Sequence, residues 1–274
     1  MRIYILGAGG MLGRALTKEF AADEIIVGDL PETDLTKAEE LRLKLESFKP
    51  EVVINAAGFT DVDGCEMNKA ACNLVNGTSV GELARICDDL KAVLVHYSTD
   101  YVFNGKYKEG YREDDEPDPI NAYGRSKCLG EQLLRKNCAK YYLIRTAWLY
   151  GEGGKNFVNT VVELAKSGKE LKIVNDQSGN PTSVKDLAEA TNRLIRSNQG
   201  YGIYHRTNSG SCSWYELALE IKRQTGFDSE IKPVSSKDYP RPALRPRYSK
   251  LINTKLEELR SWPEALKEYL TNLK

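Results

Sequence analysis

The pair of residues best suited to chemistry in this chain is Tyr123 and Lys127, in Ala122-Tyr123-Gly124-Arg125-Ser126-Lys127. On a helix, this spacing places a phenol and an ammonium group on one face. A free phenol has a pKa of about 10, and a nearby cation favours the phenolate and lowers that pKa toward neutrality. The pair therefore predicts a proton-transfer group in which Tyr123 gives or takes the proton and Lys127 lowers its pKa.

A glycine-rich loop near the N-terminus indicates what this group works beside. Gly7, Gly10 and Gly13 form Gly-x-x-Gly-x-x-Gly between a short apolar run and a helical pattern. Glycines there permit a tight turn, close approach of a pyrophosphate and close helix packing. The pyrophosphate would sit at the helix N-terminus. We therefore expect a bound dinucleotide, with Lys127 also holding its nicotinamide ribose.

Acidic and small residues after the next expected strands fit the same ligand. Asp29 stands about 20 residues past the loop, where a carboxylate accepts bonds from the adenosine ribose and repels a 2′-phosphate. It favours NADH over NADPH, although an ordinary turn aspartate before Pro31 explains it nearly as well. Asp34 is either a turn residue or a neighbour of the adenine. Asn55-Ala56-Ala57-Gly58 would let a cofactor pass close to backbone, or would serve tight helix packing.

Other polar and aromatic residues are candidates for the substrate. Thr99, in Ser98-Thr99-Asp100-Tyr101, would hydrogen-bond a substrate carbonyl and its developing oxyanion, unless it only caps the strand. Two tryptophans, Trp148 and Trp214, would stack on a base or sugar, unless they belong to the core. Four arginines are candidate phosphate clamps: Arg145, Arg241, Arg245 and Arg247.

The elements that must position these residues alternate between strand and helix patterns. Apolar β runs are expected at 2–6, 25–27, 52–54, 93–95 and 142–144, and helices at 12–20, 70–90 and 123–134. Thr36-Lys37-Ala38-Glu39 is a capping box, which predicts a helix start. The alternation predicts an α/β fold: a Rossmann-type parallel sheet with helices on both faces and ligands at the carboxyl ends of its strands.

The alternation of strand and helix patterns becomes less regular after residue 150, where Gly151-Glu152-Gly153-Gly154 is expected to be a linker or lid. Further helices are expected at 158–165, 184–197 and 214–225. We expect residues 1–146 to form the dinucleotide-binding domain, with 183–205 returning to it. Residues 147–182 and 206–274 would form a smaller C-terminal substrate-binding lobe.

Composition narrows the class of protein. Lys+Arg and Asp+Glu are both 39, which disfavours a nucleic-acid partner. No run approaches the roughly 20 apolar residues that span a bilayer, and the N-terminal run is too short for a signal peptide. Six cysteines without a CxxC and two distant histidines argue against a metal site. We expect a cytoplasmic protein with free buried thiols, Cys65 and Cys72 being packing residues.

These motifs carry a resemblance that runs nearly end to end. The chain resembles the extended short-chain dehydrogenase/reductases and, within them, the dTDP-4-dehydrorhamnose reductases. Beside the glycine loop and the Tyr123–Lys127 motif, the matching segments are 54–63, 98–103, 145–150, 176–182 and 240–242. Met11 departs from the family, which usually has Gln there.

The resemblance implies the roles of specific residues. The catalytic set would be Thr99, Tyr123 and Lys127, and the substrate contacts would be Thr99, Asp100, Tyr101, Tyr123, Trp148 and Arg245. The expected cofactor contacts are Gly7, Gly10, Met11, Leu12, Gly13, Asp29, Asp34, Leu35, Asn55, Ala56, Ala57, Tyr123 and Lys127. No metal is expected.

The activity implied is reduction, with NADPH or NADH, of the C4 ketone of dTDP-4-dehydro-6-deoxy-L-mannose to dTDP-L-rhamnose, for surface polysaccharide. The enzyme would be a monomer or homodimer. Another nucleotide-linked 4-keto-6-deoxysugar is an alternative substrate. A dehydratase or epimerase is a second reading, but dehydratases carry an Asp-Glu pair where this chain has Asp100-Tyr101. A third is a non-catalytic nucleotide-binding regulatory subunit, against which the intact Thr99, Tyr123 and Lys127 argue.

Overall fold

The computed structural model describes residues 1–197 and 199–273 and is organised around a parallel sheet of six strands. The strand order is β10-β5-β4-β3-β1-β2. The strands are β1 (Arg2–Leu6), β2 (Glu24–Gly28), β3 (Val52–Asn55), β4 (Val93–Thr99), β5 (Tyr141–Thr146) and β10 (Gly202–His205). The order reverses between β1 and β3, and such a switch point opens a ligand crevice at the carboxyl ends of the strands.

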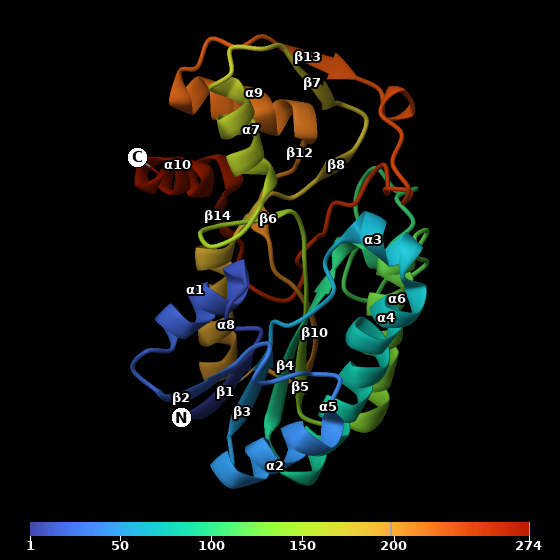
Figure 1. Cartoon of the computed structure of the whole chain (residues 1–274), viewed down its shortest axis with the longest axis vertical. Coiled ribbons are helices and arrows are strands. Elements are labelled where there is room, and N and C mark those ends of the chain that lie inside the picture. The colour runs from blue at the N-terminus through green and yellow to red at the C-terminus, as the bar shows by residue number, and fades with distance from the viewer. Residues whose placement is uncertain (198, 274) are drawn as a thin grey trace.

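Helices cover both faces of this sheet (Figure 1). One face carries α1 (Met11–Glu19) and α8 (Val184–Arg196), and the other carries α2 (Ala38–Phe48), α5 (Ser79–Asp89) and α6 (Ala122–Asn137). Side chains alternate along β1, because Ile3 and Ile5 join the core under α1 while Tyr4 and Leu6 join the opposite core. The predicted Rossmann-type fold is confirmed.

A smaller lobe lies beyond the carboxyl ends of the strands, at the top of Figure 1. Its core joins α7 (Phe157–Ala165), α9 (Trp214–Thr225) and α10 (Trp262–Asn272) to the parallel pair β7 (Leu171–Val174) and β13 (Ile231–Val234). Six further short strands pair outside the large sheet, as β6 with β9, β8 with β12 and β11 with β14. They are β6 (Leu149–Tyr150), β8 (Ser178–Gly179), β9 (Thr182–Ser183), β11 (Asn208–Ser209), β12 (Cys212–Ser213) and β14 (Leu259–Ser261). Among residues 1–197 and 199–273, no helix has the length and apolar character to cross a membrane.

The helical pattern predicted at 70–90 is confirmed with one irregularity, and a predicted capping box is wrong. The chain is helical without a break from α4 (Lys69–Asn73) to α5, but a π-helical turn at Leu74–Thr78 joins the two helices. In that turn the buried Asn76 pairs with the Phe59 backbone, accepting from its N–H at 2.8 Å and donating to its carbonyl at 2.9 Å. The capping box at Thr36 does not form, because the Thr36 hydroxyl instead donates to Asp34 at 2.7 Å and α2 begins at Ala38.

The prediction for Cys65 and Cys72 is also wrong. The structure pairs them in a disulfide, with 5.5 Å between their Cα atoms. The chain bends at Asn68, between α3 (Val62–Met67) and α4, and this bend brings the two side chains together. The remaining cysteines are free and buried, as expected: Cys87, Cys128, Cys138 and Cys212.

Candidate active site

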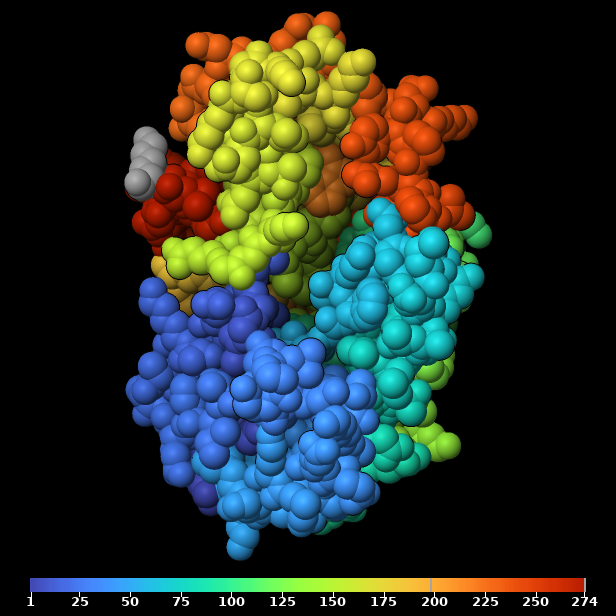
Figure 2. Space-filling view, in the orientation of Figure 1, coloured from blue at the N-terminus to red at the C-terminus, as the bar shows by residue number. Residues whose placement is uncertain are grey.

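A cavity of about 600 Å³ lies at the carboxyl ends of the sheet strands and extends to the smaller lobe. Figure 2 shows the surface hollowed between the two lobes. The volume is typical of a site for a small molecule or cofactor. Every cofactor or substrate contact implied by the resemblance lines this cavity except Arg245.

The glycine loop forms one end of the cavity, and its close contacts explain the glycines. Gly7 has a φ of +76°, and a Cβ there would lie 2.5 Å from the backbone nitrogen of Ala57. A Cβ at Gly13 would overlap the carbonyl of Gly7. Gly10 is the N-cap of α1 and supplies no side-chain cap, so the first N–H groups of the helix are left for a ligand. An anion such as a pyrophosphate fits this arrangement.

The two aspartates lie in the same part of the cavity. The Asp29 carboxylate accepts from the N–H of Gly9 at 2.5 Å and of Leu30 at 2.9 Å, so it fixes the loop against the end of β2. Asp34 accepts from the Thr36 hydroxyl and N–H, which lower the pKa of Asp34. Asp34 is therefore a turn residue that also lines the cavity.

The expected catalytic residues meet at the end of β4. The Thr99 hydroxyl donates to Asp100 at 2.9 Å and accepts from the Tyr101 N–H at 3.1 Å. Tyr123 is placed by the first turn of α6, which Asn121 caps by accepting from the Gly124 N–H at 2.7 Å. The half-buried Tyr123 ring meets the Tyr101 ring edge-on at 6.0 Å and faces the cavity.

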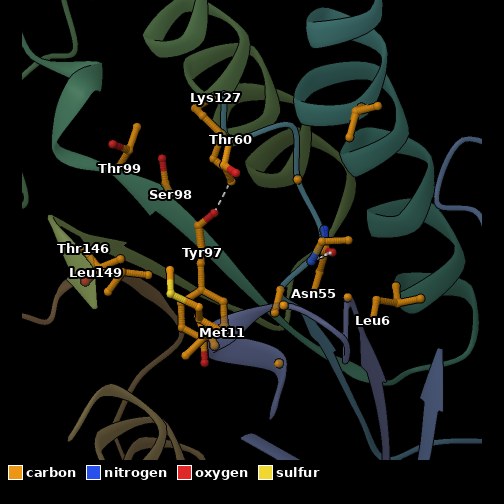
Figure 3. Close-up of a pocket in the computed structure, with 18 of the residues that line it drawn as sticks. Leu6, Met11, Asn55, Thr60, Tyr97, Ser98, Thr99, Lys127, Thr146 and Leu149 are labelled. Atoms are coloured by element: carbon orange, nitrogen blue, oxygen red, sulfur yellow. Dashed lines mark hydrogen bonds between the residues drawn. The ribbon is translucent and has the colours of Figure 1, made fainter. Parts of the chain in front are cut away.

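Lys127 points to the backbone of Tyr97 on β4 (Figure 3). Its ammonium group donates to the Tyr97 carbonyl at 2.6 Å. Burial lowers the pKa of Lys127 to about 8. The pKa of Tyr123 is raised to about 12, first by burial and then by the Asp100 charge, while the Thr99 hydroxyl opposes the rise. The expectation that Lys127 lowers the pKa of Tyr123 is therefore wrong in this structure, since its nearest partner is a carbonyl from β4.

Four buried polar atoms at the cavity have no hydrogen-bond partner within the described part of the chain: Ser98 Oγ, Asp100 Oδ2, Thr146 Oγ1 and Trp148 Nε1. Buried polar groups are normally paired, so these atoms fit a polar ligand that would satisfy them. Figure 3 shows Ser98 and Thr99 along β4 and Thr146 on the neighbouring β5. Sequence analysis missed Ser98 and Thr146 as candidates, although both follow apolar runs at strand ends.

The two tryptophans form a stacked pair in the cavity wall. Their ring centroids are 3.4 Å apart and nearly parallel, at 6°. Trp148 has a φ of +47°, a conformation that non-glycine residues seldom adopt and that clusters at functional sites. Both residues also pack on the core of the smaller lobe, as one of the two expectations had it, and both line the cavity, so stacking on a base or sugar stays a prediction.

The four candidate arginine clamps have other partners. Arg145 is fully buried and binds both carboxylate oxygens of Glu131, at 3.0 and 2.7 Å, so the prediction of a phosphate clamp there is wrong. Arg245 likewise donates to both oxygens of Asp63, and its guanidinium interacts with the Tyr101 hydroxyl at the cavity edge. Arg241 reaches Asp63 at 4.0 Å, and Arg247 lies over the Tyr248 ring.

Comparison with known proteins identifies the family. The family model described as RmlD substrate binding domain matches residues 1–274. The chain belongs to this family. A spore coat polysaccharide biosynthesis protein, SpsK of Bacillus subtilis, is 42% identical over 98% of this chain and 96% of its own length. The predicted resemblance to dTDP-4-dehydrorhamnose reductases is confirmed.

Solved structures of RmlD-family reductases have the same fold. A dTDP-4-dehydrorhamnose reductase from Clostridium acetobutylicum superposes with a TM-score of 0.96 and 42% identity, covering 100% of this chain and 99% of the other. The dTDP-4-dehydrorhamnose reductase of Bacillus anthracis, solved in complex with NADP, gives a TM-score of 0.96 and 36% identity, covering 99% of each chain. No group of three or more metal-binding side chains occurs among the residues described for this member.

Proposed function

We propose that this protein reduces the C4 ketone of dTDP-4-dehydro-6-deoxy-L-mannose to dTDP-L-rhamnose, using NADPH or NADH. The observation that carries the proposal is the meeting of Thr99, Tyr123 and Lys127 in the cavity that begins at the glycine loop. The full-length relatives named dTDP-4-dehydrorhamnose reductase support the substrate.

The cofactor would be held by residues whose geometry suits it. Gly7, Gly10 and Gly13 would receive the pyrophosphate, Asp29 the adenosine ribose, and Lys127 the nicotinamide ribose. When bound, the reduced nicotinamide supplies the hydride that adds to C4 of the sugar.

The chain itself supplies the proton. As the C4 oxygen gains charge, the Thr99 hydroxyl stabilises it by hydrogen bonding. Tyr123 then breaks its O–H bond and gives the proton to that oxygen, leaving a phenolate that solvent reprotonates. The raised pKa of Tyr123, about 12, keeps the phenol protonated at neutral pH, which is the state that a proton donor requires.

Asp29 supports NADH as the preferred cofactor. Two backbone N–H groups hold its carboxylate at the cavity, where a 2′-phosphate would meet a like charge. A cytoplasmic location and a monomeric or homodimeric state stay predictions.

The test is an assay of reduced-nicotinamide absorbance with dTDP-4-dehydro-6-deoxy-L-mannose and each cofactor in turn, with product analysis. We expect one NAD(P)H oxidised for each dTDP-L-rhamnose formed. Sugar conversion with unchanged cofactor would indicate a dehydratase or epimerase, and binding without conversion would indicate a regulatory subunit.

A further inference from the structure

Beneath the catalytic lysine lies a buried histidine that the proposed mechanism does not use. His96 is on β4 and is fully buried. Its Nε2 lies 3.4 Å from the Lys127 Nζ, and its Nδ1 lies 3.1 Å from the side-chain nitrogen of Asn55. The three residues form a line from the end of β3 to α6.

The backbone determines which atom of the Asn55 amide faces His96. The Ala57 N–H donates to the Asn55 side-chain oxygen at 3.1 Å. A backbone N–H can only donate, so the amide oxygen must face Ala57 and the amide nitrogen must face His96. The amide nitrogen is also only a donor, so His96 Nδ1 must be the acceptor.

The protonation of the ring follows from that assignment. Burial lowers the pKa of His96 well below its usual value, and the Lys127 charge lowers it further, so the ring is neutral. A neutral ring that accepts at Nδ1 carries its proton on Nε2. This N–H points at Lys127, and an ammonium group has no lone pair with which to accept it.

We propose that His96, fixed in the Nε2–H tautomer by Asn55, is a positioning residue for Lys127 that disfavours the ammonium form of the lysine. The opposing influences come from the Tyr97 carbonyl, which accepts from Nζ at 2.6 Å, and from Glu131, one turn along α6. The two oxygens of the Glu131 carboxylate already accept hydrogen bonds from Nε and Nη2 of Arg145, so Glu131 does not pair with Lys127. The consequence is that the lysine takes up and loses its proton closer to neutral pH than a free lysine does.

The first test is the tautomer itself, read from long-range ¹H–¹⁵N correlations of protein labelled on histidine nitrogen. The chain has 2 histidines, and His205 is an internal contrast. Its Nδ1 lies 3.0 Å from the Ile252 carbonyl, which can only accept, so His205 must carry its proton on Nδ1. We expect opposite tautomers at His96 and His205, assigned with His205→Gln. A proton on Nδ1 of His96, or a cationic ring at neutral pH, would overturn the proposal.

The second test is the titration of Lys127, followed by NMR of ¹⁵Nζ-labelled lysine in protein without cofactor and assigned with Lys127→Met. A Gln at position 96 can turn an amide oxygen toward Nζ. His96→Gln should therefore raise the Lys127 midpoint from about pH 8. We expect a rise of about one unit, the size of one added hydrogen bond to an ionised group. His205→Gln should leave the midpoint unchanged. Equal midpoints in wild type and His96→Gln would refute the proposal.

The kinetic consequence rests on the proposed function, but the two NMR tests do not. We expect kcat to fall as Lys127 loses its proton. In His96→Gln this fall should move to higher pH with the Lys127 midpoint, while the dissociation constant of the cofactor changes less than threefold. A moved NMR midpoint with no sugar reduction would contradict the proposed function alone. An unmoved midpoint in an active enzyme would contradict the role of His96 alone.

Discussion

Asp100 provides a sharp test of the electrostatics of the site, because its carboxylate is buried with one oxygen unpartnered among the described residues. Burial raises the pKa of Asp100 from 3.8 to about 7, and the nearby hydroxyls of Ser249 and Thr99 oppose the rise. The folded state then holds a proton that the unfolded chain has lost between these two pH values. Folding stability should therefore fall as pH rises from about 4 to 7. With about 1.4 kcal/mol for each pKa unit, the loss is about 4 kcal/mol.

Asp100→Asn keeps the shape of the side chain and removes its charge. We expect the variant to match wild type in unfolding free energy at pH 4 and to exceed it by up to about 4 kcal/mol at pH 8. Urea unfolding of both proteins between pH 4 and pH 8 measures the difference in free energy of unfolding. Subtracting the wild-type value from the variant value at each pH removes the contribution of the other titrating groups. If the difference between the two proteins does not change with pH, then Asp100 is ionised in the folded protein and the reasoning is wrong.

Three further substitutions test the fold and the cofactor end of the site. Glu131→Gln leaves the buried Arg145 charge without its partner and should lower the free energy of unfolding, measured by thermal unfolding, by about 3–5 kcal/mol. The control Glu163→Gln, in the exposed pair with Lys166, should lower it by at most about 1 kcal/mol. Equal losses in the two variants would refute a structural role for Arg145. Gly13→Ala forces a Cβ onto the Gly7 carbonyl and should lower the free energy of unfolding in urea by about 1–3 kcal/mol. The control Gly200→Ala, with open space around it, should change that free energy by no more than about 0.5 kcal/mol. An unchanged stability of Gly13→Ala would show that the glycine loop is not tightly packed. Asp29→Asn removes a charge of the same sign as the 2′-phosphate and should therefore improve the affinity for NADPH relative to NADH about tenfold. Titration with each cofactor measures the two dissociation constants. An unchanged ratio of these constants would mean that Asp29 is only a turn residue.

The sequence predicts much of the fold, because strand and helix periods alternate clearly in the first half of the chain. The glycine loop, the end of β4 and the Tyr123 motif each follow a strand, and parallel strands bring their carboxyl ends to one edge. This is why local motifs far apart in sequence predict a common site.

The wrong predictions, and the irregularity in the helical pattern at 70–90, concern residues whose contacts are made with residues distant in the sequence. The spacing of Tyr123 and Lys127 does not reveal that the Tyr97 carbonyl competes for the ammonium group. Arg145 looks like a phosphate clamp until Glu131 is placed beside it on α6. Helical periodicity continues through residues 74–78, and only the inward turn of Asn76 toward Phe59 shows why a π-helical turn forms.

The most direct test of the proposed chemistry compares Tyr123→Phe with wild type in a single turnover. The substitution keeps the ring and removes only the hydroxyl that gives the proton to the C4 oxygen. We expect the cofactor dissociation constant to stay near that of wild type and the rate of sugar reduction to fall by about 10²–10⁴. A rate near that of wild type would contradict the central claim that the Tyr123 hydroxyl supplies this proton.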